Sequence, residues 1–135
     1  MNLQNDRGAV AAEFALLLPV LLTILLAIIE FGMIMYGREI VTNAAREGAR
    51  AGITQGPPKL SKGTIEGISY TYLANTGINP ATVTFTATGA GLINPATLTV
   101  QGQYTYNFMF PYIPAMIPGI PNPLIINVQT VMRHE

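Results

Sequence analysis

Side chains that could act as nucleophiles, general bases or metal ligands are few in this 135-residue chain. There is no cysteine, the one histidine is His134, and the one aspartate is Asp6. Outside the N-terminal helical region (residues 9–53) the glutamates are Glu66 and Glu135, too few for a convincing paired-carboxylate site. No Ser–His–Asp or Cys–His arrangement can be formed from these residues. The sequence also has no metal-ligand spacing and no phosphate-binding loop motif. The sequence therefore predicts a protein that is not an enzyme and that holds no cofactor or metal.

Two other carboxylates, Glu13 and Glu30, belong to a long apolar segment. Residues 14–36 are almost entirely apolar and would span about 34 Å as a helix, enough for a hydrocarbon core of about 30 Å. We predict a transmembrane helix, because the remaining residues could hardly bury so long an apolar helix in a soluble protein. Charged residues make up 10% of the chain and the net charge is zero, so no basic surplus indicates nucleic-acid binding.

Glu30 lies near the far end of this apolar segment, about 24 Å beyond Phe14 in a helix. A carboxylate in hydrocarbon is unfavourable unless it is paired or protonated. Glu30 could reach the outer membrane interface, pair with a basic residue of a partner in an intramembrane contact, or carry a proton. The sequence leaves these three alternatives open.

The residues before the apolar segment resemble a processing site. Residues 1–8 form a short polar leader that ends in Gly8, followed by Ala9, Glu13 and Phe14. This order resembles the site cut by prepilin peptidases, where the fifth residue of the mature chain is Glu and the sixth is aromatic. Cleavage after Gly8 would make Ala9 the new N-terminus. The resemblance implies that Glu13 serves assembly by pairing with the α-amino group of a neighbouring subunit; alternatively, Glu13 caps the helix start in the headgroup region.

The resemblance extends over about residues 7–52 and returns in the closing VMRHE. The EFAL start, IIEFG and NAAREGARAG resemble the TadE-like family, pilin-like (pseudopilin) proteins of the tight-adherence (Flp) pilus system. The resemblance implies a structural subunit of the bacterial inner membrane, with a single pass and an extracytoplasmic C-terminal domain, that can enter a surface pilus. Implied partners are other pilin-like subunits in homo- or hetero-oligomers, a prepilin peptidase, the inner-membrane pilus platform with its ATPase, and membrane lipid. The filament would serve adhesion, secretion or uptake.

The positive charges near the two ends of the predicted transmembrane helix favour the orientation opposite to the one that the resemblance implies. Arg7 lies on the leader side, against Arg38, Arg46, Arg50 and Lys59 on the other side. This distribution reverses the positive-inside preference. The expected orientation, with the N-terminus in the cytoplasm, therefore rests on the processing site.

Two rival functions remain open. One is an uncleaved, single-pass scaffold of an envelope secretion or assembly machine. The other is a membrane enzyme or its accessory chain, with an active site shared with another subunit and with Glu30 or Glu66 essential for catalysis.

Helical character continues beyond the apolar segment, so we predict one helix over residues 9–53. Pro19 is expected to kink this helix. Small residues recur at every fourth position at Ala44, Gly48 and Gly52, forming a smooth ridge that lets another backbone approach. The partner of this ridge could be a neighbouring subunit, but the protein's own domain is favoured because the ridge lies outside the bilayer.

The remainder, residues 54–135, is predicted to be an extracytoplasmic α+β domain. Apolar residues spaced as in an amphipathic helix predict a short helix over residues 61–77. Alternating apolar and polar residues predict strands over residues 81–88 and 96–108, and residues 124–132 are read as a last strand. The three strands are expected to be antiparallel and to pack on the long helix. A bulge is expected at Gln101-Gly102. The proline-rich residues 111–123 should form neither a regular helix nor a central strand. They could pack on the sheet, or form an exposed apolar patch that docks a partner or touches the membrane.

Overall fold

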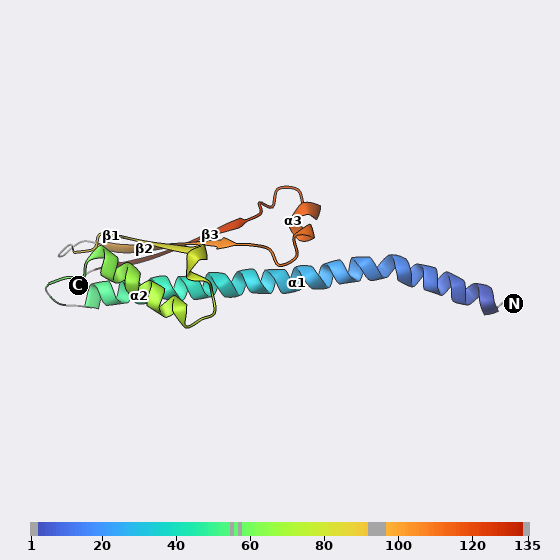
Figure 1. Ribbon diagram of the computed structural model, residues 1–135, viewed down its shortest axis with the longest axis horizontal. Helices are drawn as coiled ribbons and strands as arrows, with labels where there is room; N and C mark the ends of the chain where they lie inside the picture. The colour runs from blue at the N-terminus through green and yellow to red at the C-terminus, as the bar shows by residue number, and fades with distance from the viewer. Residues whose placement is uncertain (1–2, 55, 57, 92–96, 134–135) are drawn as a thin grey trace.

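One long helix carries a small α+β domain on its C-terminal half (Figure 1). The computed structural model describes residues 3–54, 56, 58–91 and 97–133, with side chains described from Gly8 onward. The elements, in chain order, are α1 (Leu3–Thr54), α2 (Lys62–Ala74), a 3-10 turn η1 (Pro80–Thr82), β1 (Val83–Thr88), β2 (Thr97–Tyr106), α3 (Tyr112–Met116) and β3 (Leu124–Arg133). The predicted α+β fold, with a long N-terminal helix, a short helix and an antiparallel sheet, is confirmed.

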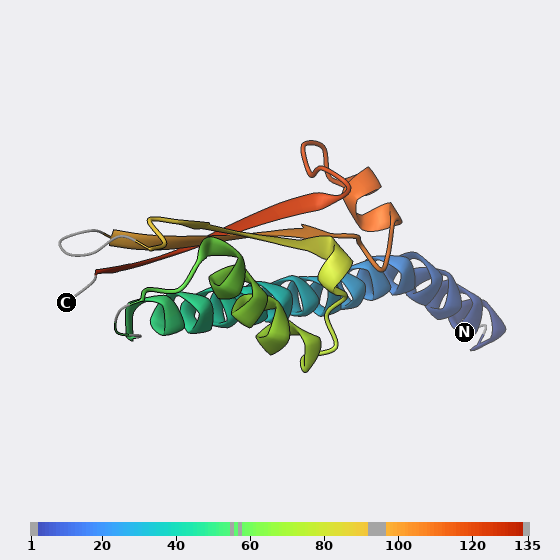
Figure 2. The ribbon, with the colours of Figure 1, turned by 60° about the vertical axis from the view of Figure 1, so that its left-hand side comes forward.

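The sheet and α2 pack along the C-terminal part of α1, whereas the N-terminal part of α1 projects alone (Figures 1 and 2). α1 runs through Pro19 as a continuous helix, and Figure 1 shows a gentle bend in this N-terminal part. The N-terminal part is the apolar one, so the element with the greatest need for burial is the one that the domain leaves largely uncovered.

The three strands form one antiparallel sheet in the order β1-β2-β3. The bulge expected at Gln101-Gly102 is wrong, because pairing is continuous there and Gly102 faces Phe85 on β1 and Val128 on β3. The reason for glycine is close packing: a Cβ at Gly102 would lie 2.8 Å from Val41 Cγ1 of α1. Gly102 thus lets the sheet pack directly on α1.

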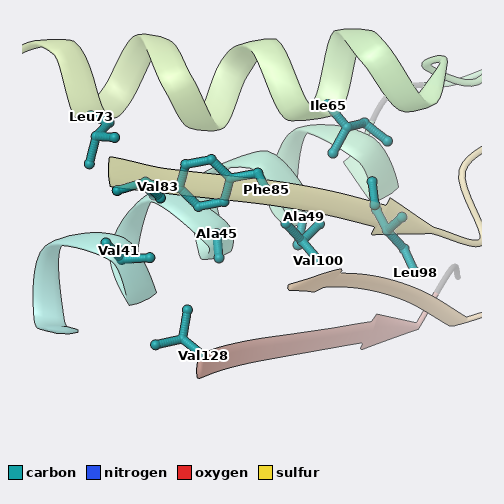
Figure 3. Packing of buried hydrophobic residues seen from close by; sticks show 12 residues of the cluster. Val41, Ala45, Ala49, Ile65, Leu73, Val83, Phe85, Leu98, Val100 and Val128 are labelled. Carbon is teal, nitrogen blue, oxygen red and sulfur yellow. The ribbon is translucent and has the colours of Figure 1, made fainter. Parts of the chain in front are cut away.

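The core lies between α1, α2 and one face of the sheet (Figure 3). Alternation along β1 turns Val83, Phe85 and Ala87 inward and threonines outward. From the helices, Val41, Ala45, Ala49, Ile65 and Leu73 meet these strand residues, as Figure 3 shows. Burial of this apolar surface holds the sheet on α1.

α2 closes the free edge of β1. Its start is capped by Ser61, whose hydroxyl accepts from the Thr64 N–H at 3.3 Å. The Tyr70 hydroxyl donates to the Val83 carbonyl and accepts from the Phe85 N–H, both at 3.3 Å. Side chains of α2 therefore satisfy backbone groups that an edge strand would otherwise offer to another chain.

The proline-rich segment differs in one respect from the prediction, because it contains the short helix α3. α3 spans five residues and begins directly after Pro111, so Pro114 falls in its first turn, where a missing N–H is tolerated. Ile113 and Pro114 are buried, while Tyr112 and Met116 remain exposed. α3 lies beyond the end of the sheet, toward the N-terminal part of α1 (Figures 1 and 2).

Candidate functional site

The residues of the expected processing site all lie on α1. Gly8, Ala9, Glu13 and Phe14 are exposed, and a Cβ added at Gly8 would meet nothing within 4 Å. Over the described residues no hydrogen bond or ion pair engages the Glu13 side chain. The fold thus leaves this acid available to a partner.

α1 is long and apolar enough to cross a membrane, judged by length and composition. Its most apolar 18-residue window has a mean hydropathy of 2.6, and only 6% of that window is buried inside the protein. A core helix of a soluble protein would be mostly covered, so the apolar surface of α1 requires lipid or other subunits.

Glu30 is the best-defined polar site of the described chain. Its side chain is 2% exposed and is held by three donors from one short segment. The Tyr106 hydroxyl donates to Oε1 at 2.6 Å, the Met109 N–H donates to Oε1 at 2.9 Å, and the Phe110 N–H donates to Oε2 at 3.2 Å. Both carboxylate oxygens are therefore satisfied within the chain.

This arrangement gives a physical reason for an acid near the end of an apolar segment. Burial raises the pKa of the Tyr106 phenol, and its hydrogen bond to Glu30 raises it further, so the phenol stays a donor at neutral pH. Among the described residues the donors to Glu30 include no basic side chain, so within this chain the contact is to a phenol and to backbone amides.

The ridge residues lie against the protein's own domain. Ala44 is fully buried, and a Cβ at Gly48 would collide with Ser69 Oγ and lie 3.0 Å from the Ile65 carbonyl oxygen. A Cβ at Gly52 would collide with Leu98. The small residues therefore allow α2 and β2 to approach α1 closely within one chain.

Sequence reasoning singled out Glu30 but missed its partners. Two of the three donors are backbone N–H groups, which no residue type marks, and the third, Tyr106, is 76 residues away in the chain. The structure does not bring Glu13 and Glu30 together, since both lie on one helix about 26 Å apart. Glu66 lies elsewhere, where its Oε1 accepts from the Ala87 N–H at 2.9 Å.

Catalytic groups do not gather in the described part of the chain. No group of three or more His, Cys, Asp or Glu residues that could hold a metal is found there. His134 and Glu135 lie outside the described residues, as does the side chain of Asp6.

The long helix is also the part of the chain that comparison with known proteins recognises. Residues 8–50 match the model of a family described as TadE-like protein. Over these residues the chain is similar to TadE-like proteins. The matched residues begin at the expected cleavage site and end beside Gly52 of the ridge, whereas the sheet and α3 lie outside the match. No curated protein and no solved structure matches the chain.

The family match covers most of α1, and the fold adds to this helix a small α+β domain that the match does not cover. Among the described residues, α1 is the one helix long and apolar enough to cross a membrane. The family match does not cover the α+β domain that this helix carries, so the role of the domain follows from its own contacts.

Proposed function

We propose that this TadE-like chain is a pilin-like structural subunit of a tight-adherence pilus, cut after Gly8 by a prepilin peptidase and assembled through Glu13. The observation that carries the proposal is the family match over residues 8–50, which includes Gly8, Glu13 and Phe14. The exposed, apolar α1 supports it, because a subunit that polymerises needs a helix surface free to pack on its neighbours.

Contacts at the far end of the apolar segment support a membrane part of α1 that ends before Glu30. Tyr36 donates to the Thr76 carbonyl at 3.4 Å, Gly37 lies against the Tyr104 ring, and Glu30 is bound by the segment after β2. We therefore place the span at residues 9–29 rather than 14–36, which at 1.5 Å per residue is about 31 Å. The subunit would cross the bacterial inner membrane once, with its domain on the extracytoplasmic side.

In this placement Glu13 lies just inside the cytoplasmic side of the hydrocarbon region, where an unpaired carboxylate is unfavourable. Cleavage after Gly8 creates an amine at Ala9, and the Ala9 amine of one subunit can pair with Glu13 of the next. Assembly then exchanges lipid around α1 for neighbouring helices and exchanges an unpaired charge for an ion pair. The peptidase, the inner-membrane platform and its ATPase are the partners that such a pathway needs.

Replacing Glu13 by alanine is expected to abolish most incorporation into filaments without preventing cleavage. Loss of a charge-assisted contact worth about 1.5–3 kcal/mol would lower incorporation by roughly one to two orders of magnitude. The measurement is the amount of the subunit in sheared pili relative to membranes of the natural host. Glu39→Ala is the matched control, because Glu39 is an exposed acid on the same helix outside the proposed span.

Incorporation of Glu13→Ala at the level of the unchanged protein would contradict the assembly role. Equal loss in Glu39→Ala would show that removal of any acid from α1 disturbs the subunit, and would also contradict the specific role of Glu13.

A further inference from the structure

The segment that binds Glu30 also reaches toward the membrane. This segment, the β2–β3 loop (residues 107–123), has no charged side chain, and its polar side chains are Asn107, Tyr112 and Asn122. Four of its large apolar or aromatic residues are exposed, Met116 most of all at 64%: Met109, Tyr112, Met116 and Ile117. Such a concentration of exposed apolar side chains in one loop indicates a contact surface.

The loop lies beside the part of α1 that precedes Glu30. Met116 lines a small apolar groove together with Pro19, Val20, Thr23 and Ile24 of α1. Ile24 lies six residues before Glu30, which is about 9 Å toward the membrane centre, and Val20 lies about 15 Å from Glu30 along the helix. If α1 crosses the bilayer, the tip of the loop is at membrane depth.

We propose that the β2–β3 loop enters the outer leaflet of the bilayer beside α1, with lipid as its partner. The exposed side chains of the loop adjoin the exposed apolar surface of α1, so the two form one continuous apolar surface. A second apolar groove of about 440 Å³ opens between loop and helix, lined among others by Phe31, Ile34, Ile113 and Ile117.

The prolines of the loop lower the number of backbone N–H groups that would need a partner next to lipid. Irregular backbone is costly in lipid because its N–H groups lack partners, and prolines have no N–H to leave unpaired. The loop has five such residues: Pro111, Pro114, Pro118, Pro121 and Pro123. Ile113 N–H donates to the Phe110 carbonyl at 3.0 Å and Ile120 N–H to the Ile117 carbonyl at 3.4 Å.

Glu30 fixes the depth at which the loop enters. Its carboxylate accepts the N–H groups of Met109 and Phe110, the residues with which the chain leaves β2 and turns toward the membrane. Tyr112 follows with an exposed amphipathic ring, the type of side chain enriched at membrane interfaces. The loop therefore passes from a polar anchor at Glu30, through an interfacial aromatic, to an apolar tip at Met116.

The chain has no tryptophan, so a single introduced tryptophan reports its own surroundings. The test uses the full chain in phosphatidylcholine vesicles at high lipid-to-protein ratio, with Met116→Trp in the loop, Ile24→Trp on α1 and Thr86→Trp on the outer face of the sheet. Lipids brominated on their acyl chains quench only tryptophans in the bilayer. We expect Met116→Trp and Ile24→Trp to show blue-shifted emission and similar quenching, and Thr86→Trp to show neither.

Quenching of Met116→Trp as weak as that of Thr86→Trp, with Ile24→Trp quenched, would overturn the loop proposal while leaving membrane insertion of α1 in place. Absence of quenching for Ile24→Trp would overturn both. Tyr112→Trp, a conservative change in the same loop, is measured in parallel, so that a folding defect of one variant does not decide the result.

Discussion

Replacing Glu30 by alanine is expected to release the β2–β3 loop and to lower the free energy of unfolding by about 3 kcal/mol. The carboxylate is the shared acceptor of the Tyr106 hydroxyl and of the Met109 and Phe110 N–H groups. Alanine leaves three donors without a partner, at a buried position where water cannot readily replace the acceptor. The measurement is urea unfolding of the full chain in detergent micelles, together with protease cleavage in residues 107–123.

Glu39→Ala serves as the control for Glu30→Ala, because this acid on the same helix is exposed and should change the free energy of unfolding by no more than about 0.5 kcal/mol. Tyr106→Phe should have a smaller effect than Glu30→Ala, since it removes one donor and leaves the two backbone contacts. A Glu30→Ala protein as stable and as protease-resistant as its parent would show that the loop is held by apolar packing alone.

Replacing Gly48 by valine is expected to lower the free energy of unfolding by about 2–3 kcal/mol. A Cβ at this position would collide with Ser69 Oγ and lie 3.0 Å from the Ile65 carbonyl oxygen. The serine side chain can turn away, but the carbonyl belongs to the backbone of α2, so the two helices must separate. Helix propensity acts in the other direction, but a gain of less than about 1 kcal/mol over glycine does not offset the collision.

The matched control for Gly48→Val is Gly67→Val. Gly67 lies within α2, and a Cβ there meets nothing within 4 Å. The same substitution should therefore change the free energy of unfolding by no more than about 0.5 kcal/mol. Equal effects of the two substitutions in urea unfolding would contradict close helix packing as the reason for the ridge.

The sequence patterns predicted the elements of this fold well because most of its signals are local. The apolar segment and the strict alternation of β1 each depend on neighbouring residues. Gly102 led to the wrong prediction of a bulge, because a glycine inside a strand can indicate either a bulge or a close approach of another element. Only the position of α1, with Val41 against Gly102, decides between them.

The candidate site was predictable in part for the same reason. The spacing of Gly8, Glu13 and Phe14 can be read along the chain, and so can the unusual position of Glu30. The environment of Glu30 cannot, because it is formed by a loop from the other end of the chain, mostly through backbone groups. Likewise, the sequence indicated that the proline-rich segment is apolar, whereas its place beside Ile24 of α1 follows from the fold.

The most direct test of the proposed function is the intact mass and N-terminal residue of the protein recovered from membranes of its natural host. We expect a mature chain that begins at Ala9, with Glu13 as its fifth residue. That result would establish the free amine on which the assembly mechanism depends. A chain that keeps residues 1–8 in cells with an active prepilin peptidase would contradict the mechanism and favour an uncleaved, membrane-anchored scaffold.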